Sequence, residues 1–284
     1  MRSVAMISAA LALAIMVVGC ATQRAAVTPG PTQAATANPP AGATAMPSPV
    51  AVCTNPHGGV CLGPLAAGTY ATRQFATPLT YTVPAGWANY EDLPGNFLLV
   101  PPTASLDELD AGTSDYVGVY DGVAVADAEC SERSQSGIEQ TPAAMVAWFV
   151  EHEGLDTTDP AAVTLGGLDG AVVDLRIADG YADGCPYEGY EGVPMVPLFI
   201  GAGLAEVHHV ALGQIVTRLY VLEGRGGRIL VIEVSDVPGG TPLEELDAVV
   251  HEFVFGESGN ASGPRSASSR ASPEASSGGS QLYG

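Results

Sequence analysis

Apolar and polar residues alternate along several short runs in the middle of the chain, a pattern typical of half-buried β-strands. The clearest run is Leu79–Val83, which alternates with period two and stops at a Pro-Ala-Gly turn. We expect further strands at residues 97–100, 116–120, 171–177, 215–222 and 228–234. Because short turns join consecutive strands, the sequence predicts a mainly antiparallel sheet.

The last two runs flank the glycine-rich segment Glu223–Gly227 and predict a β-hairpin. Apolar side chains occupy both faces of both runs, whereas a strand with one exposed face would keep that face polar. We therefore expect this hairpin to lie in the centre of the sheet.

Two other segments repeat apolar residues at helical spacing. One follows Thr141-Pro142, a cap and a proline suited to the first helical turn, and the other follows Thr241-Pro242. Thr241 and Glu244 also match a capping box. The expected apolar stripes are Met145, Trp148, Phe149 and His152 in the first helix and Leu246, Val249, Val250 and Phe253 in the second. With each helix covering a face of the sheet, the fold class is α+β: a mainly antiparallel sheet with two or more helices packed on it.

Composition separates this domain from both ends of the chain. Residues 20–51 consist mainly of Ala, Thr, Pro and Gly, and residues 258–284 are rich in Ser and Gly. Such compositions are typical of disordered segments, here a tether and a tail. Residues 52–257 are expected to form a single α+β domain, long enough to bury a substantial core.

The first nineteen residues have the pattern of an export signal. Arg2 precedes an apolar stretch that is too short to cross a membrane comfortably, and Val17–Cys20 resembles a bacterial lipobox. In such leaders cleavage makes the cysteine the first mature residue, and its sulfur carries a diacylglyceryl group. We expect residues 1–19 to be removed and the lipid on Cys20 to hold the protein at the extracytoplasmic face of the cell membrane. An ordinary cleaved signal or an uncleaved anchor is the alternative.

Besides Cys20 the chain contains four cysteines, an even number that suits disulfide bonds in an exported protein. Four thiols allow three pairings. We expect Cys53–Cys61, which closes a short loop, and Cys130–Cys185, which joins two loops far apart in the sequence. A zinc site is the competing interpretation, although no Cys-x-x-Cys or His-x-x-x-His motif accompanies these residues.

The predicted domain is strongly acidic. Residues 52–257 contain six Arg against thirty Asp and Glu, and the whole chain has no Lys. Such a surface repels nucleic acid and anionic lipid head groups, so we expect no nucleic-acid partner and a membrane contact made through the lipid anchor. The absence of Lys also excludes Schiff-base and P-loop chemistry.

Several short segments resemble PsbP-like domains, including the mycobacterial LpqN-type lipoproteins. These segments are Leu79–Trp87, a strand followed by Pro-x-Gly-Trp, and Val163–Ala171, a Gly-Gly turn followed by a strand. Pro94–Phe97 and Cys185–Tyr187 are similar to segments of a group of uncharacterised actinobacterial and chloroflexal lipoproteins. The resemblance covers about residues 69–256 and implies a PsbP-like α/β sandwich at the cell envelope. It implies no activity, cofactor or catalytic residue.

No catalytic motif is present in the sequence. His152-Glu153 and His251-Glu252 lack the second histidine of a zinc-protease helix, and no Gly-x-Ser-x-Gly elbow occurs. His152 instead suits a helix C-terminus, where a cation is favourable. The adjacent His208-His209 would face opposite sides of a strand and could not share one metal ion. We assign no catalytic residue, no metal ligand and no cofactor.

The best candidate for a contact surface is the glycine-rich segment 179–191, which carries four carboxylates and three tyrosines beside Cys185. Its tyrosines could dock a sugar or a protein, and its carboxylates could bind calcium, although the EF-hand spacing is missing. A solvated acidic loop is the remaining alternative. The candidate residues are Asp179, Tyr181, Asp183, Tyr187, Glu188, Tyr190 and Glu191.

Together these features predict a membrane-anchored extracytoplasmic lipoprotein without enzymatic activity that binds an envelope protein or a small ligand. The alternatives are an envelope hydrolase whose residues meet only in the folded chain, and a calcium-stabilised structural domain.

Overall fold

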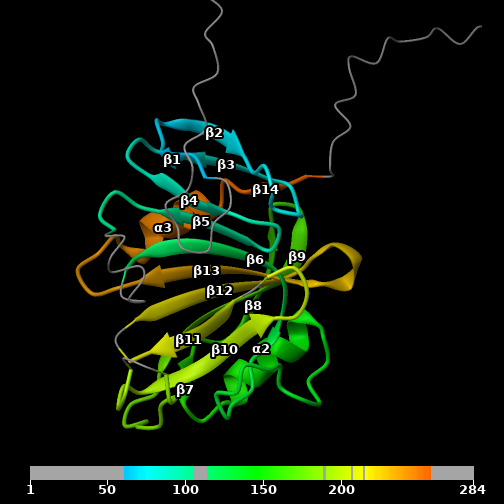
Figure 1. Ribbon diagram of the computed structural model, residues 1–284, viewed down its shortest axis with the longest axis vertical. Helices are drawn as coiled ribbons and strands as arrows, with labels where there is room; N and C mark the ends of the chain where they lie inside the picture. Colours follow the sequence, from blue (N-terminus) through cyan, green and yellow to red (C-terminus); the bar gives the residue numbers. More distant parts are fainter. Residues whose placement is uncertain (1–60, 105–113, 188–189, 206, 214, 257–284) are drawn as a thin grey trace, which may run out of the picture. The chain divides into compact units, whose positions relative to one another are not determined.

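The computed structural model describes residues 61–104, 114–187, 190–205, 207–213 and 215–256. The predicted leader, tether and tail, including Cys20, lie outside the described residues, as do Cys53 and Glu188 of the predicted domain. Figure 1 shows the described elements and their labels. The helices are α2 (Pro142–Glu151), the short 3-10 helix η1 (Arg225–Gly227) and α3 (Leu243–Val250). The strands are β1 (Gly63–Pro64), β2 (Gly68–Ala71), β3 (Leu79–Val83), β4 (Ala88–Asp92), β5 (Asn96–Val100), β6 (Tyr116–Val125), β7 (Leu155–Thr157), β8 (Ala161–Leu165), β9 (Leu168–Ile177), β10 (Met195–Gly201), β11 (His208–Leu212), β12 (Val216–Glu223), β13 (Ile229–Asp236) and β14 (Val254–Phe255).

These strands form two sheets whose pairings are antiparallel throughout the described part of the chain. The larger sheet has the order β1-β4-β5-β6-β13-β12-β9-β7, with β8 paired to β9 and the β10–β11 hairpin attached to β6 through β10. The smaller sheet has the order β14-β3-β2. The predicted α+β class with a mainly antiparallel sheet is therefore confirmed.

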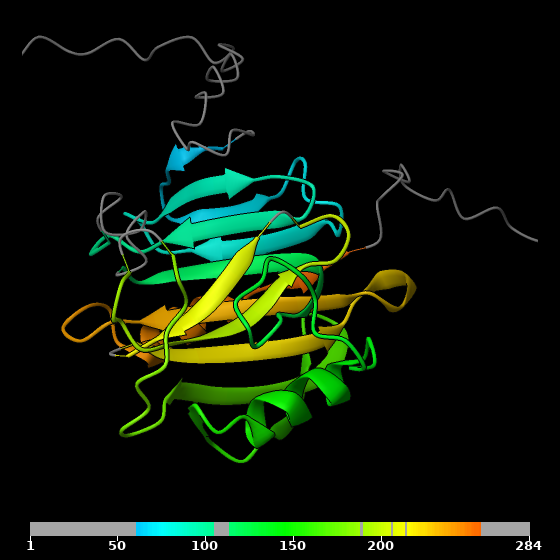
Figure 2. The same cartoon turned by 60° about the horizontal axis from the view of Figure 1, so that its bottom comes forward.

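Both faces of the larger sheet are buried around its central hairpin. Tyr220 and Leu230 pack in an apolar cluster with α3 and β3, whereas their neighbours Leu219 and Val231 pack with α2 and β10. Figure 2 shows α2 and the β10–β11 hairpin on the same side of the sheet. The prediction that this hairpin is central and apolar on both faces is confirmed, because alternate side chains enter two different cores.

The first helix, α2, begins as the sequence predicts. Thr141 is the N-cap, its side-chain oxygen accepts the backbone N–H of Ala144 at 3.2 Å, and Pro142 occupies the first turn. The buried stripe consists of Met145, Val146 and Phe149, which face the sheet. No helix in the described part of the chain is long and apolar enough to cross a membrane.

The start of α3 differs from the prediction. Its N-cap is Pro242, and no side chain caps it, so the predicted capping box of Thr241 with Glu244 is wrong. Thr241 is engaged elsewhere, because its backbone N–H donates to Asp115 and its hydroxyl is hydrogen-bonded to Thr103. These contacts hold the segment before α3 against the residue that precedes β6 and against the loop after β5.

The strand β4 is absent from the sequence prediction because it ends in two acidic residues, Glu91 and Asp92, which are nonetheless buried. Asp92 accepts backbone N–H groups from Arg73, Gln74 and Phe75 at 2.6, 3.1 and 2.9 Å. Such bonds replace the water that a buried carboxylate loses. Asp92 thus attaches the segment between β2 and β3 to the larger sheet.

Candidate functional site

An open cleft of about 550 Å³ lies at the C-terminal end of α2. Three segments form it: the end of α2, the loop after β6 and the connection from β9 to β10. We call it the α2 cleft. Its volume lies within the usual range of small-molecule sites. Its aromatic and charged lining residues are Trp148, Glu151, His152, Glu153, Tyr181 and Asp183.

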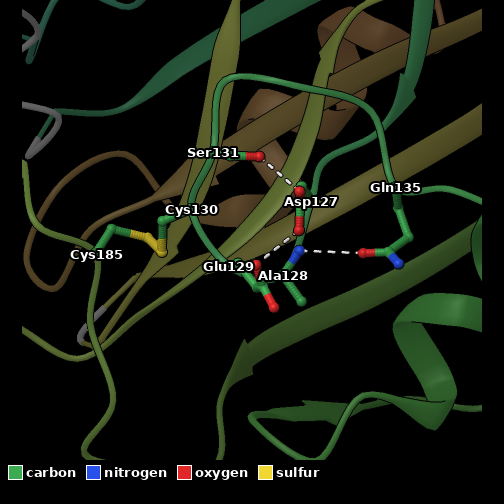
Figure 3. Close-up of a disulfide and its surroundings, with 7 residues drawn as sticks. All are labelled: Asp127, Ala128, Glu129, Cys130, Ser131, Gln135 and Cys185. Carbon is green, nitrogen blue, oxygen red and sulfur yellow. Dashed lines mark hydrogen bonds between the residues drawn. A yellow bond between two sulfur atoms is a disulfide. The ribbon is translucent and has the colours of Figure 1, made fainter.

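The disulfide bond between Cys130 and Cys185 joins two of these segments, as the sequence predicts (Figure 3). Cys130 lines the cleft, and Cys185 directly follows the lining residue Gly184. The other predicted bridge remains a prediction: Cys61 is buried, and Cys53 lies outside the described residues.

Hydrogen bonds to Asp127 shape the loop that carries Cys130 (Figure 3). The Asp127 carboxylate accepts the Ser131 hydroxyl at 2.5 Å and the backbone N–H of Glu129 at 3.0 Å. Both bonds lower the pKa of Asp127, and the bond from Ser131 has the larger effect. Cys130 adopts a φ of 56°, in the left-handed region that side-chain-bearing residues rarely occupy. The loop is therefore fixed both by Asp127 and by the covalent bond.

Aromatic rings form one wall of the cleft. Trp148 and His152, one turn apart on α2, have ring centroids 4.8 Å apart, and the His152 ring meets Tyr181 edge-on at 6.4 Å. Tyr181 lies close to Gly154, where an added Cβ would come within 2.8 Å of the tyrosine ring. Glycine at this position allows Tyr181 to pack directly against the backbone after α2.

His152 is neutral in this arrangement. The backbone N–H of Gly154 donates to its Nδ1 at 3.0 Å, so the ring proton is on Nε2. Burial lowers the pKa of His152, and the nearby Glu153 only partly opposes this effect. The prediction that His152 ends the helix is confirmed, since it is the C-cap of α2. The predicted cationic role at the helix terminus is wrong, because the ring accepts a hydrogen bond there.

The cleft is negatively charged. Glu151, Glu153 and Asp183 are exposed carboxylates, and none of the described lining residues is an Arg. The chain has no Lys that could neutralise them. Burial raises the pKa of Tyr181, and the negative charges of Asp183 and Glu153 raise it further, so its hydroxyl remains protonated. The aromatic wall therefore faces acidic groups with no opposing cation among the lining residues.

The predicted contact segment is divided by the structure. Tyr181 and Asp183 line the cleft. Asp179 instead pairs with Arg176, whose Nη1 lies 2.9 Å from its Oδ1, and the Asp179 side chain is almost fully exposed.

The other described candidate residues of the segment, Tyr187, Tyr190 and Glu191, are not among the lining residues of the cleft. Tyr187 and Tyr190 are half-buried, and the N–H of Tyr190 donates to the carbonyl of Tyr187 at 3.1 Å. Glu191 is exposed, and Glu188 lies outside the described residues. Within the ranges that the structure describes, no group of three His, Cys, Asp or Glu is placed to hold a metal ion.

Sequence reasoning missed the contribution of α2 to this site. It assigned Trp148 to the apolar stripe, although the side chain is only half-buried, and it placed His152 at the end of the helix without assigning it to a contact surface. The useful signal was the pairing of Cys130 with Cys185, because it brings two distant loops together.

A second group of polar residues connects β11 to β13. Nδ1 of His209 lies 2.7 Å from Oε2 of the buried Glu233, yet that oxygen makes no hydrogen bond of acceptable geometry. We therefore describe the contact as electrostatic. The His209 ring stacks on Phe199 at 4.8 Å and lies 4.5 Å from Tyr120. Burial raises the pKa of Tyr116 and Tyr120, and the negative charge of Glu233 raises both further.

Comparison with known proteins gives few matches. No protein-family model and no curated protein matches the chain. A crystal structure from Bacteroides thetaiotaomicron is similar at 11% identity and a TM-score of 0.32, covering 68% of this chain and 50% of that chain. The match thus spans half the length of the Bacteroides protein. The solution structure of the cyanobacterial PsbP protein CyanoP from Synechocystis is similar at 10% identity and a TM-score of 0.32, covering 67% of this chain and 94% of that chain. Likeness at this level carries no statement about function.

Proposed function

We propose that this protein is a lipid-anchored, extracytoplasmic binding module without catalytic activity, and that the α2 cleft holds its ligand. The observation that carries the proposal is the convergence of Trp148, His152 and Tyr181 on one open cleft. Two segments of that cleft are joined by the Cys130–Cys185 bond. Aromatic side chains in a concave, covalently braced site offer a large contact area at a low cost in conformational entropy.

Two features support the proposed location. The Val17–Cys20 run has the pattern of a lipidation signal. The Cys130–Cys185 bond is of a kind that persists in oxidising compartments and is rare in the cytosol. The resemblance of residues 69–256 to PsbP-like lipoproteins agrees with this placement.

Site-specific photocrosslinking in cells tests the binding role. Benzoylphenylalanine replaces Tyr181 in the cleft or, as the control, Tyr70 on the smaller sheet. We expect irradiation to give a discrete adduct from position 181 only, and we expect Trp148→Leu to remove it. No adduct at position 181, or the same adducts from both positions, would contradict the proposal.

The proposed anchor is tested separately. Cys20→Ala should move the protein from the membrane fraction to the soluble fraction or block its processing. Unchanged membrane fractionation of that variant would count against lipidation.

One observation favours the alternative of a hydrolase. A histidine whose Nδ1 faces a buried carboxylate, as His209 faces Glu233, is two-thirds of a catalytic triad. The contacts of His209 within the described residues are with Glu233 and aromatic rings, and they include no serine or cysteine. Labelling of the protein by a fluorophosphonate probe, lost in His209→Asn, would favour this alternative.

A further inference from the structure

The lining of the α2 cleft combines two groups that attract a positive charge. An aromatic face attracts a cation placed within about 6 Å of its centre, and tryptophan is the strongest such ring. Trp148 and Tyr181 supply aromatic surface, while Glu151, Glu153 and Asp183 supply carboxylates around it. A ligand with a positive head and an apolar surface would interact favourably with both groups.

Positive side chains near the cleft are already paired with other partners. Arg133, in the loop that carries Cys130, has its Nη2 3.8 Å from Oδ2 of Asp127. Arg176, near the end of β9, pairs with Asp156 at 2.5 Å and with Asp179 at 2.9 Å. Neither arginine is among the residues that line the cleft. Among the described residues, therefore, no arginine lies in the lining to repel a positively charged ligand.

The state of His152 agrees with this preference. Its Nδ1 accepts the backbone N–H of Gly154, so the ring on the cleft wall carries no positive charge of its own. A protonated imidazole would lose this hydrogen bond and would repel a bound cation. The ring instead extends the aromatic surface of Trp148.

Other ligand classes fit the cleft less well. An anion would be repelled by the three carboxylates. A bare divalent ion prefers several oxygen ligands around one point. The described residues contain no group of three His, Cys, Asp or Glu arranged in that way.

We propose that the α2 cleft binds small molecules that carry an alkylammonium group. The aromatic rings of Trp148 and Tyr181 would contact one side of the ammonium, and the neighbouring carboxylates would face its other side. The proposal rests on the binding role proposed above and adds the chemical class of the ligand. It assigns specificity to the charge of the ligand, because an uncharged ligand of the same shape would interact only with the aromatic surface of the cleft.

Isothermal titration calorimetry on the full chain in detergent tests this assignment with two matched probes. Choline carries a quaternary ammonium, and 3,3-dimethylbutan-1-ol has the same shape with a carbon in place of the nitrogen. We expect choline to bind at least about tenfold more tightly than the alcohol, with an affinity that falls as salt is added. Equal binding of the two probes, or no binding of choline, would overturn the proposal.

Three variants locate the binding. Trp148→Leu should weaken choline binding by about tenfold by removing the strongest aromatic contact. The double variant Glu151→Gln with Glu153→Gln should weaken it and flatten its salt dependence. Glu223→Gln, which removes an exposed carboxylate at the end of β12, is the control and should leave binding unchanged. Melting temperatures of all variants show whether each remains folded.

The outcomes separate the ligand class from the binding role. If choline does not bind while position 181 still gives a photocrosslinked adduct, the cleft binds a ligand of another class and only this inference is wrong. If both experiments fail, the binding role of the cleft is wrong as well. If Trp148→Leu is folded and binds choline as the unaltered chain does, the cation lies elsewhere and the proposal fails.

Discussion

Arg228 and Asp121 form a two-point ion pair, in which Nε and Nη2 of Arg228 each lie 2.9 Å from a different carboxylate oxygen of Asp121. The Asp121 side chain has no exposed surface, whereas Arg228 is about 38% exposed. The Thr77 hydroxyl donates to the same carboxylate at 2.6 Å. Asp121, on β6, thus connects the segment before β3 to the start of β13.

We expect Arg228→Met to lower the free energy of unfolding by about 3 kcal/mol, because it leaves a fully buried carboxylate without its cation. Urea unfolding measures this change.

Arg176→Met is the matched control for this substitution. Arg176 pairs with Asp156 and Asp179, but the side chains of Arg176 and Asp156 are about half exposed and that of Asp179 is almost fully exposed. Exposed pairs contribute at most about 1 kcal/mol. Equal losses of stability in Arg228→Met and Arg176→Met would contradict the burial argument.

The Cys130–Cys185 bond closes a loop with a sequence separation of 55 residues. We expect the double variant Cys130→Ser with Cys185→Ser to lose about 4 kcal/mol of stability on the chain-entropy model. Alkylation of the denatured chain without reductant, followed by peptide mass analysis, should leave both cysteines unlabelled. Labelling of either cysteine under these conditions would refute the bond.

Buried tyrosines should make the protein sensitive to alkali. Burial raises the pKa of Tyr116, Tyr120 and Tyr220 above the ordinary value of about 10. Above that pH the unfolded chain releases phenolic protons that the folded chain keeps. The unfolded state then binds fewer protons, and stability falls as the pH rises, by about 1.4 kcal/mol per pH unit for each such tyrosine.

Phenolate absorbance provides the measurement. Among the ten tyrosines of the chain, those with raised pKa should ionise only when the protein unfolds. Ionisation of every tyrosine near pH 10 in the folded protein would contradict the assignment.

His152 should titrate below the ordinary histidine pKa of about 6.5, since burial lowers its pKa and Glu153 partly opposes the shift. NMR of the imidazole protons measures this value, and Glu153→Gln should lower it further. Because the unfolded chain takes up the proton at a higher pH than the folded chain, the contribution of His152 to stability is lost as the pH falls below about 6.5. A pKa that rises in Glu153→Gln would show that the interaction has the opposite sign.

The sequence predicted the elements whose side chains follow one clear period. Leu79–Val83 matches β3 in both bounds, and the hairpin of β12 and β13 is recognisable because its apolar residues on both faces require a central place. Elements stabilised by distant polar contacts were not predictable. Asp92 makes β4 resemble a loop, and only the folded chain provides the three N–H groups that it accepts.

The candidate site was predictable only in part, because local sequence marks some of its residues and not others. Tyr181 and Asp183 stand out in a segment rich in tyrosine and acid, and the cysteine pairing places them beside another loop. Trp148 has the helical spacing of a core residue, so periodicity alone could not reveal that part of its side chain remains exposed. The capping box failed because the backbone N–H of Thr241, which Glu244 would have accepted, donates instead to Asp115, a residue remote in sequence.

The sulfur atoms of Cys130 and Cys185 come from loops, and none of the described strands contains a cysteine. The described strand pairings therefore do not depend on oxidation, whereas the covalent link between the two loops beside α2 does. A reducing environment would remove this link without breaking a strand pairing, so the Cys130–Cys185 bond couples the geometry of the α2 cleft to the redox state of the compartment.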